Sequence, residues 1–406
     1  MGPLEGIRIL DMTSVLMGPY ATQLMGDLGA DVVKVEAPEG DIVRGIGPGR
    51  SPGMGGMFLT TNRSKRSIVL DLKRPAGREA MLRLATRFDV LITNVRPLAM
   101  ERLGLGYQAV AAANPALVYV ALVGFGQDGP MAARPAYDDL IQGATGLASL
   151  GAHASGQAPR YAPLALADRV VGLHAFGATL AALLSRARTG RGQRVDVPMF
   201  ETMASFVLGD HLSGLAFDPP LDDGGYARLL APDRRPYETL DGHVCVLIYN
   251  DAEWRRFFTL VCRPEMLDDP RFANHGARAQ HIRAIYAVVA DIIRTRTTAD
   301  WLEALLKADI PAAPMNGIGE LLDDKQLAAT GFFQFADHPT EGRIRTMRVP
   351  SAWSGTPPEQ GRPAPGLGEH GAEILAESGW SAAEIDALHA AGALVLPPHV
   401  PPTETP

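Results

Sequence analysis

The sequence predicts an α/β protein, with a mainly parallel sheet in a large first domain and a smaller α/β domain after it. In residues 1–125, short runs of β-branched and apolar residues alternate with helical patterns, which is the order of βαβ units. Near residue 216, a cluster of prolines and glycines separates this region from a second set of elements. The chain has 406 residues, 46% of them hydrophobic, which is enough for more than one core.

The first domain is expected to be built from strands separated by helices. Pro19 and Gly29 bracket the first helix, because proline suits the first helical turn and glycine the position past the end. The expected strands cover residues 7–10, 31–36, 67–72, 90–93 and 117–123, and the expected helices cover residues 19–28 and 75–87. Ligands of parallel sheets bind outside the carboxyl ends of the strands, so the residues just after each strand are candidates for a site.

A long helix over residues 169–188 is apolar almost all round, so we expect it to be buried. Asp241-Gly242 indicates a hairpin in the second domain. Residues 125–168 are rich in loops, a strand at 193–197 and a helix from 200 follow, and further helices are expected at 252–261, 278–295, 298–307 and 382–391. The expected domains are 1–215 (large), 216–329 (small), 330–396 (a C-terminal return segment) and 397–406 (a disordered, proline-rich tail).

Composition argues against several classes of protein. A formal net charge of −7 predicts that nucleic acid is not a partner, because nucleic-acid binding needs a basic surface. Cys245 and Cys262 form no CxxC pair, so we expect neither a disulfide framework nor a metal site. The N-terminus lacks a signal-peptide pattern and no run of 18 apolar residues occurs, which predicts a cytoplasmic protein with no membrane partner.

Residues 124–129 match the dinucleotide-binding pattern GxGxxG after a predicted strand. In that motif the third glycine opens a helix whose N-terminal amides bind pyrophosphate. Pro130 and Pro135 follow here, so we interpret the segment as a tight loop rather than a nicotinamide site. The sequence contains no Walker A, HExxH or GxSxG pattern, which argues against an NTPase, a zincin and an α/β-hydrolase.

Asp168 stands immediately before the long helix and has two compatible interpretations. As an N-cap, its carboxylate would accept hydrogen bonds from amides of the first turn. As a nucleophile or base it would need to be ionised, which a helix N-terminus favours. His174 lies on the same helix, and a core histidine is a commoner explanation for it than a catalytic one.

Charged residues near strand ends are further candidates. Residues 62–66 (NRSKR) form a basic turn that is either a solvated loop or a phosphate contact. Lys73 and Arg102 lie where a phosphate-bearing ligand would bind in this architecture, although each alone is more typical of a surface charge. Residues 137–139 (YDD) carry paired carboxylates, which suit either acid–base chemistry or a capped turn.

Several segments together resemble the family III CoA-transferases, a group that includes formyl-CoA:oxalate CoA-transferase and α-methylacyl-CoA racemase. The resemblance covers nearly the whole chain and depends on the order and spacing of its segments. Among them are residues 3–41, 62–73 (NRSKRSIVLDLK), 134–147 (RPAYDDLIQGATGL), 165–197 and 366–375 (GLGEHGAEIL). The resemblance implies a large Rossmann-like domain, a small α/β domain, a C-terminal segment that packs back on the large domain, and two chains interlocked as a homodimer.

The resemblance also implies a reaction. Asp168 would be the nucleophile, forming first an aspartyl anhydride and then an aspartyl–CoA thioester. An acyl-CoA is the donor and a carboxylic acid the acceptor, so the CoA thioester is a substrate and no tightly bound cofactor is expected. Leu16, Tyr137 and Asp138 would lie beside the thioester. The residues expected to bind CoA are Ser14, Val15, Leu70, Lys73, Asn94, Val95, Arg96 and Arg102.

The chain departs from the transferase pattern at three places. Where the best-known pattern has an arginine after the second strand, this chain has Ala37-Pro38, so one phosphate contact is lost or supplied from elsewhere. Leu16 replaces a glutamine of the catalytic site, which makes oxalate a doubtful acceptor. Residues 246–250 lack the glycine cluster of a family loop, which points to a larger acid: a C4–C6 dicarboxylate, or a branched or aromatic acid.

Two other functions stay open at this point. A 2-methylacyl-CoA racemase would share the aspartate, but it needs a second acid–base residue across from it. Where the racemase pattern has histidine, this chain has Tyr137, a poor base, so transfer is favoured over racemisation. The third function is non-catalytic CoA binding, and the intact Asp168 argues against it.

Overall fold

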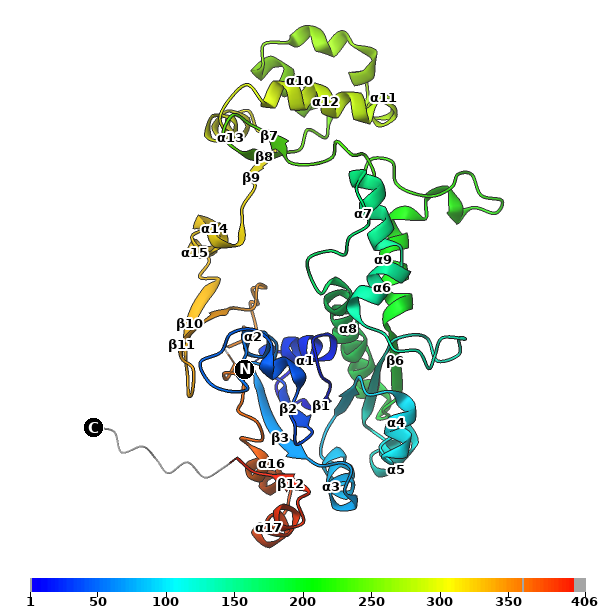
Figure 1. Cartoon of the computed structure of the whole chain (residues 1–406), viewed down its shortest axis with the longest axis vertical. Helices are drawn as coiled ribbons and strands as arrows, with labels where there is room; N and C mark the ends of the chain where they lie inside the picture. The colour runs from blue at the N-terminus through cyan, green and yellow to red at the C-terminus, as the bar shows by residue number, and fades with distance from the viewer. Residues whose placement is uncertain (1, 360, 398–406) are drawn as a thin grey trace, which may run out of the picture. The chain divides into compact units, whose positions relative to one another are not determined.

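The computed structural model describes residues 2–359 and 361–397, and the chain divides into two compact units (Figure 1). The large unit comprises the described residues of Met1–Thr145, Ala162–Ser205 and Ala328–Pro406. The small unit comprises Gly146–Tyr161 and Phe206–Leu327. The C-terminal part of the chain thus belongs to the same unit as its N-terminal part. Residues 398–406 of the expected proline-rich tail lie outside the described residues.

The described part of the large unit is built on a seven-stranded sheet in the order β12-β3-β2-β1-β4-β5-β6. Strands β1 to β6 are parallel, and β12 pairs antiparallel with β3. The strands are β1 (Arg8–Met12), β2 (Asp31–Glu36), β3 (Lys65–Leu70), β4 (Val90–Thr93), β5 (Val118–Val123), β6 (Arg194–Pro198) and β12 (Leu394–Val395). The predicted α/β class with a mainly parallel sheet is confirmed. The order reverses between β1 and β4, which places the carboxyl ends of these two strands at a switch point of the sheet.

Helices cover the sheet and bury its apolar residues in a continuous core that includes Leu91, Tyr119 and Ile374. The presence of Ile374 in this core shows that the C-terminal segment packs on the sheet. The helices are α1 (Met17–Asp27), α2 (Gly56–Thr61), α3 (Pro75–Ala85), α4 (Pro97–Arg102), α5 (Tyr107–Ala113), α6 (Asp138–Ala144), α8 (Leu166–Thr189), α16 (Gly371–Glu377) and α17 (Ala382–Ala390), together with α9 (Met199–His211), which continues into the small unit from Phe206. A hairpin of β10 (Phe333–His338) and β11 (Gly342–Met347) completes the unit.

The basic segment at residues 62–66 is not a solvated loop, which corrects one expectation from the sequence. Strand β3 already begins at Lys65, two residues earlier than expected. The Lys65 side chain is fully buried and its ammonium lies 3.0 Å from a carboxylate oxygen of Asp11. Arg66 is also buried and forms ion pairs with Asp31 and Glu373. These two cations hold elements of the large unit together and are not free to bind a phosphate.

Helix α8 differs from its prediction at its start and in its surroundings. It begins at Leu166, so Asp168 lies inside the first turn and is not the N-cap. It packs on α1, α6, β5 and β6. Gly172 permits the close approach of α1, because a Cβ atom at this position would lie 2.8 Å from the carbonyl oxygen of Met17. The other face is not buried in the single chain: Leu173 and Leu184 are 51% and 60% exposed. His174 is exposed as well, so it is not a core histidine.

By length and composition alone, α8 would also suit a membrane span, and it is the one helix among the described residues that does. Its packing on α1, α6, β5 and β6 accounts for the apolar residues of one face only. The preceding residues 125–168, expected to be mostly loop, contain α6 and α7 (Leu147–Ser155). The GxGxxG segment at 124–129 does form turns rather than the start of a helix, as predicted.

The small unit combines a short antiparallel sheet with helices. The predicted hairpin is confirmed, because β7 (Tyr237–Glu238) pairs with β8 (His243–Val246), and β9 (Ala312–Pro314) adds to its other side. An aromatic core of Trp254, Phe257, Phe258 and Trp301 lies under these elements. The helices are α10 (Asp251–Leu260), α11 (His275–Gln280), α12 (Ile282–Ile293), α13 (Thr298–Lys307) and α14 (Ile318–Leu322), and α15 (Lys325–Ala329) leads back to the large unit.

Candidate active site

Asp168 and Asp138 lie together at the start of α8. The backbone N–H of Asp168 donates a hydrogen bond to the Oδ1 atom of Asp138, at 2.9 Å. Asp138 therefore caps α8 in place of Asp168, for which capping was one of two expected roles, since Ala165, the N-cap of α8, makes no side-chain hydrogen bond. This arrangement leaves the Asp168 carboxylate free of a capping role and half-buried at the helix start.

Gln142, which is not among the candidates predicted from the sequence, fixes the position of Asp138. Its Nε2 donates to the Oδ2 atom of Asp138 at 2.6 Å and to the carbonyl oxygen of Leu164 at 3.2 Å. Its Oε1 accepts from the backbone N–H of Ala162 at 2.9 Å. The buried amide thus ties α6 to the segment that leads into α8. The spacing of Asp138 and Gln142, four residues apart on one helix face, was the available signal.

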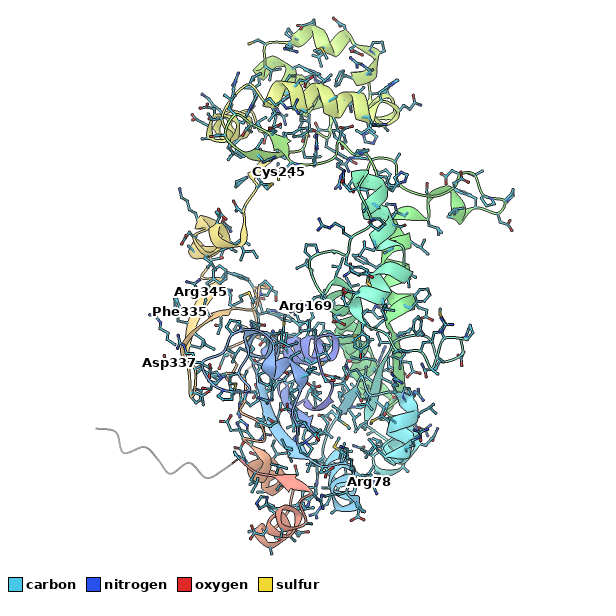
Figure 2. The ribbon with its side chains drawn as sticks, viewed as in Figure 1. Arg78, Arg169, Cys245, Phe335, Asp337 and Arg345 are labelled. Atoms are coloured by element: carbon cyan, nitrogen blue, oxygen red, sulfur yellow. The ribbon has the colours of Figure 1, made fainter. Side chains whose placement is uncertain are left out.

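The electrostatic surroundings raise the pKa of Asp168 to about 7. The first cause is burial, which disfavours the charged form, and the second is the negative charge of Asp138. Arg169 acts in the opposite direction. Its guanidinium lies over the ring of Tyr20 on α1, 4.4 Å from the centroid, and Figure 2 labels it. The raised pKa of Asp168 is opposite to the expectation that the helix start would favour its ionised form.

The loop between β1 and α1 carries three of the candidate residues and is tied to the end of β4. The backbone N–H of Ser14 donates to Asn94 Oδ1 at 3.0 Å, and Asn94 Nδ2 donates to the carbonyl oxygen of Ser14 at 2.8 Å. Val15 has a φ of 70°, a left-handed conformation that is strained for a β-branched residue. Leu16, the N-cap of α1, is buried. The loop therefore has one defined conformation at the switch point of the sheet.

Buried charges hold this loop in place from below. The Lys34 ammonium donates to the carbonyl oxygen of Thr13 at 2.9 Å and to Asp41 Oδ2 at 2.8 Å, and both charged side chains are almost fully buried. Asp41 Oδ1 in turn accepts from the backbone N–H of Val15 at 3.2 Å. Because burying a charge costs free energy unless it is paired, two buried charges beneath one loop indicate that the loop's shape is strongly specified. Lys34 and Asp41 were not singled out from the sequence, although a lysine inside the apolar run DVVKVE was a visible signal.

The remaining candidates lie after β3 and β4. Leu70 is 1% exposed and its side chain belongs to the core, so only its main chain is available to a ligand. Lys73 is exposed, and Arg78 of α3 positions its loop by donating to the carbonyl oxygens of Leu72 and Lys73 at 3.2 and 3.0 Å (Figure 2). On the β4 side, Val95 and Arg96 follow the strand, and Arg102 ends helix α4. Arg96 and Arg102 are exposed, whereas Val95 is half-buried.

The structure thus joins the candidates in pairs rather than in one cluster. Asp138 and Asp168 share a hydrogen bond, and Ser14 and Asn94 share two. Tyr137, the N-cap of α6, is 68% exposed and makes no side-chain cap hydrogen bond. The Lys73 ammonium lies 3.9 Å from the carboxylate of Glu39, which follows β2. The arrangement places a half-buried carboxylate at a helix start, and cations at the carboxyl ends of the strands.

Comparison with known proteins identifies the family of this chain. Residues 4–371 match the family described as CoA-transferase family III. The chain belongs to CoA-transferase family III. It is 35% identical to a succinate–glutarate CoA-transferase of Agrobacterium fabrum over 385 residues, which cover 92% of this chain and 95% of that protein. A succinyl-CoA:glutarate CoA-transferase of Mus musculus is 32% identical, over 93% of this chain and 86% of its own length.

A solved structure supports the same assignment at the level of the fold. The crystal structure of a CaiB/BaiF family protein from Brucella suis superimposes with a TM-score of 0.78, at 33% sequence identity. The match covers 93% of this chain and 99% of that one. The family III CoA-transferase described here is therefore an enzyme of the EC 2.8.3 type, and CoA thioesters are the substrates of such enzymes.

Proposed function

We propose that this family III CoA-transferase moves CoA from an acyl-CoA thioester to a carboxylic acid through covalent intermediates on Asp168. The observation that carries the proposal is the position of the Asp168 carboxylate, half-buried in the first turn of α8 and free of a capping role. A carboxylate of raised pKa is a better nucleophile once ionised, and partial exclusion of water protects an anhydride from hydrolysis.

The reaction balances without a net proton. An Asp168 carboxylate oxygen attacks the thioester carbonyl carbon, the C–S bond breaks, and CoA leaves as the thiolate while a mixed anhydride remains. The thiolate then attacks the aspartyl carbonyl carbon and releases the donor acid as a carboxylate, which leaves an aspartyl–CoA thioester. The acceptor carboxylate attacks that thioester, giving a second anhydride and CoA thiolate. Attack of the thiolate on the acceptor's acyl carbon yields the new acyl-CoA and restores Asp168.

We place CoA at the carboxyl ends of β1, β3 and β4. Ser14 and Val15, joined to the β4 side through Asn94, would contact the nucleotide with their main chain, as would Leu70. CoA carries several phosphate charges, so exposed cations near these strand ends are required, and these are Lys73, Arg96 and Arg102. The lysine and the two arginines compensate for the absence of an arginine at Ala37.

For the acceptor we propose a dicarboxylate with a C4–C6 chain. Two features support this choice. The buried Leu16, in place of a glutamine, offers an apolar side chain where a compact, highly polar acid such as oxalate would need a hydrogen bond. The relatives named above act on glutarate and succinate or succinyl-CoA, which fall within this size range.

We further propose that the enzyme is a homodimer whose chains interlock. The support is the number of large apolar side chains that a single chain leaves exposed, among them Leu173 and Leu184 on α8 and Phe206 on α9, 54% exposed. Soluble proteins rarely leave such a surface uncovered. Light scattering on the purified protein should give twice the chain mass of 43.3 kDa, and Leu184→Glu should lower it toward a single chain. A stable monomer of the unaltered protein would contradict the proposal.

The proposed reaction is tested with a matrix of donors and acceptors. Succinyl-CoA and acetyl-CoA are each incubated with a panel of mono- and dicarboxylates, and new acyl-CoA species are identified by mass spectrometry. We expect dicarboxylate-CoA products from the unaltered enzyme and none from Asp168→Ala. Hydroxylamine added after the donor should place a hydroxamate on Asp168. If no acid accepts CoA while α-deuterium exchanges in 2-methylacyl-CoA, the enzyme is a racemase and the proposal fails.

A further inference from the structure

A cavity of about 460 Å³ lies within the small unit, and its lining includes residues 246–249 of the loop that lacks a glycine cluster. It is bounded by β8, by α12 and by the segment that leads into β7; Figure 2 labels Cys245, one of its lining residues on β8. One wall is hydrocarbon and includes Ile248, Ile282 and Val289. Such a wall provides a surface for the apolar body of a ligand, but it offers nothing to a small inorganic ion.

The lining also carries cationic side chains. Four arginines line the cavity, and no aspartate or glutamate among the described residues does so. Arg278 is buried and its charge is matched by Asp251. The other three, Arg228, Arg234 and Arg235, have no ion pair with a carboxylate in the described chain. In a protein with a net charge of −7, a concave surface with three unmatched cations selects an anion.

Tyrosine side chains add a donor and a flat surface to this cavity. Tyr237 is only 7% exposed, and its hydroxyl has no hydrogen-bond partner among the residues described. A tyrosine hydroxyl can donate and accept hydrogen bonds, so in the lining of a cavity it is available to a ligand or to water. Tyr249 lies at the edge of His275, with ring centroids 5.5 Å apart, and the Arg228 guanidinium is 5.7 Å from its centroid.

We propose that this cavity binds an organic dicarboxylate with a short hydrocarbon chain. The chain would lie on the wall formed by Ile248, Ile282 and Val289. The two carboxylates would be bound by Arg228, Arg234 and Arg235, with the Tyr237 hydroxyl as an additional donor. Three cations match a dianion better than a monoanion, and the apolar wall favours a carbon chain over free phosphate. The inference extends the proposed function, because the acceptor acid proposed above belongs to the same chemical class.

Calorimetric titration of the full-length enzyme tests the ligand class. Glutarate, hexanoate and inorganic phosphate serve as probes at constant ionic strength. Glutarate carries two carboxylates on a hydrocarbon chain, hexanoate carries one carboxylate on a hydrocarbon chain, and phosphate carries charge without a hydrocarbon chain. We expect glutarate to bind at least about tenfold more tightly than either of the others, which corresponds to about 1.4 kcal/mol. Phosphate binding as tight as that of glutarate would overturn the proposal, since it would show that the cavity binds anions without recognising a hydrocarbon chain.

Variants test the residues. The double substitution Arg234→Gln with Arg235→Gln removes two exposed charges and should weaken glutarate binding at least about tenfold. Tyr237→Phe keeps the packing of the ring, removes only the hydroxyl, and should weaken binding by a smaller factor. Arg283→Gln is the matched control, because Arg283 is exposed, faces Asp233 at 3.8 Å and does not line the cavity. Equal binding by the double variant and the control would overturn the proposal.

The nucleophile variant separates this inference from the proposed reaction. Asp168→Ala should abolish CoA transfer and keep glutarate binding within about twofold of the unaltered enzyme. Transfer that survives in Asp168→Ala would refute the covalent mechanism and leave the cavity proposal standing. Loss of glutarate binding in Asp168→Ala, with unchanged binding in the arginine variant, would refute the cavity proposal and leave the mechanism standing.

Discussion

The Oδ1 atom of Asp138 accepts a hydrogen bond from the backbone N–H of Asp168 at 2.9 Å, so the candidate nucleophile and the neighbouring carboxylate are joined through the main chain. This contact has two consequences of opposite kind. It satisfies an amide at the start of α8, which stabilises the helix. It also places a negative charge close to the Asp168 carboxylate, which, after burial, is the second cause of its raised pKa.

Replacing Asp138 by asparagine should separate these two consequences. The asparagine oxygen still accepts the Asp168 amide hydrogen, but the negative charge is gone, so the pKa of Asp168 should fall from about 7. The acid limb of kcat/KM against pH should therefore move to lower pH, and activity at pH 6 should rise relative to activity at pH 8. Asp139→Asn is the control, because Asp139 is exposed in the same helical turn. An acid limb that stays in place or moves to higher pH would show that Asp138 does not act through its charge.

The sheet and its helices were predictable because their signals are local. Residues 31–36 form a run of apolar residues ended by charges, and Pro75 begins a helix, as this position of proline indicates. The basic segment before β3 was misread for a physical reason. Lys65 and Arg66 look solvated in a linear sequence, and only the neighbouring strands bring Asp11 and Asp31 to them. The two partners of each of these ion pairs are distant in sequence, so neither residue alone indicates that the pair forms.

In the candidate site too, the local pattern was predicted correctly and a contact between residues distant in sequence was not. Asp168 was placed near a helix start from its local pattern, but its cap is Asp138, 30 residues away. The sequence therefore indicated a carboxylate of interest and assigned it the wrong hydrogen bond. His174 was misplaced for a related reason. The apolar pattern of α8 predicts a buried helix, but it does not indicate which face of the helix the rest of the same chain covers.

Asp168 should make the protein less stable at alkaline pH than at acidic pH. Its pKa is about 7 in the folded chain against 3.8 for the unperturbed group. Between these values the folded state binds more protons than the unfolded state, so this contribution to stability is full below pH 3.8 and is lost as the pH rises through about 7. Asp168→Asn, which cannot ionise, should raise the melting temperature at pH 8 and have little effect below pH 3.8, by thermal scanning across pH. A difference of the same size at every pH would mean that asparagine acts through packing and not through charge.

Breaking the buried pair of Lys65 and Asp11 should destabilise the large unit strongly. Burial alone would raise the pKa of Asp11, but the ammonium groups of Lys65 and Lys34 outweigh it and lower the pKa to about 2. Lys65→Met leaves that carboxylate with one cation fewer, and the expected loss is about 3–5 kcal/mol of unfolding free energy, measured in urea. The double variant with Asp11→Asn should lose less than the sum of the two single variants. Strict additivity would show that the two side chains do not stabilise each other.

Asn94 should affect CoA binding more than it affects stability, because its two hydrogen bonds hold Ser14 at the switch point of the sheet. Asn94→Ala removes both bonds, at about 1 kcal/mol each, and should raise the KM for acyl-CoA about five- to tenfold with kcat nearly unchanged. Asn114 offers a matched control, since its Nδ2 donates to the carbonyl oxygens of Ala85 and Phe88 at 2.9 and 3.0 Å, away from the candidate residues. Asn114→Ala should lower the unfolding free energy by a comparable amount and leave KM unchanged. If both variants raise KM equally, the effect comes from general loosening of the fold and Asn94 has no special role in binding CoA.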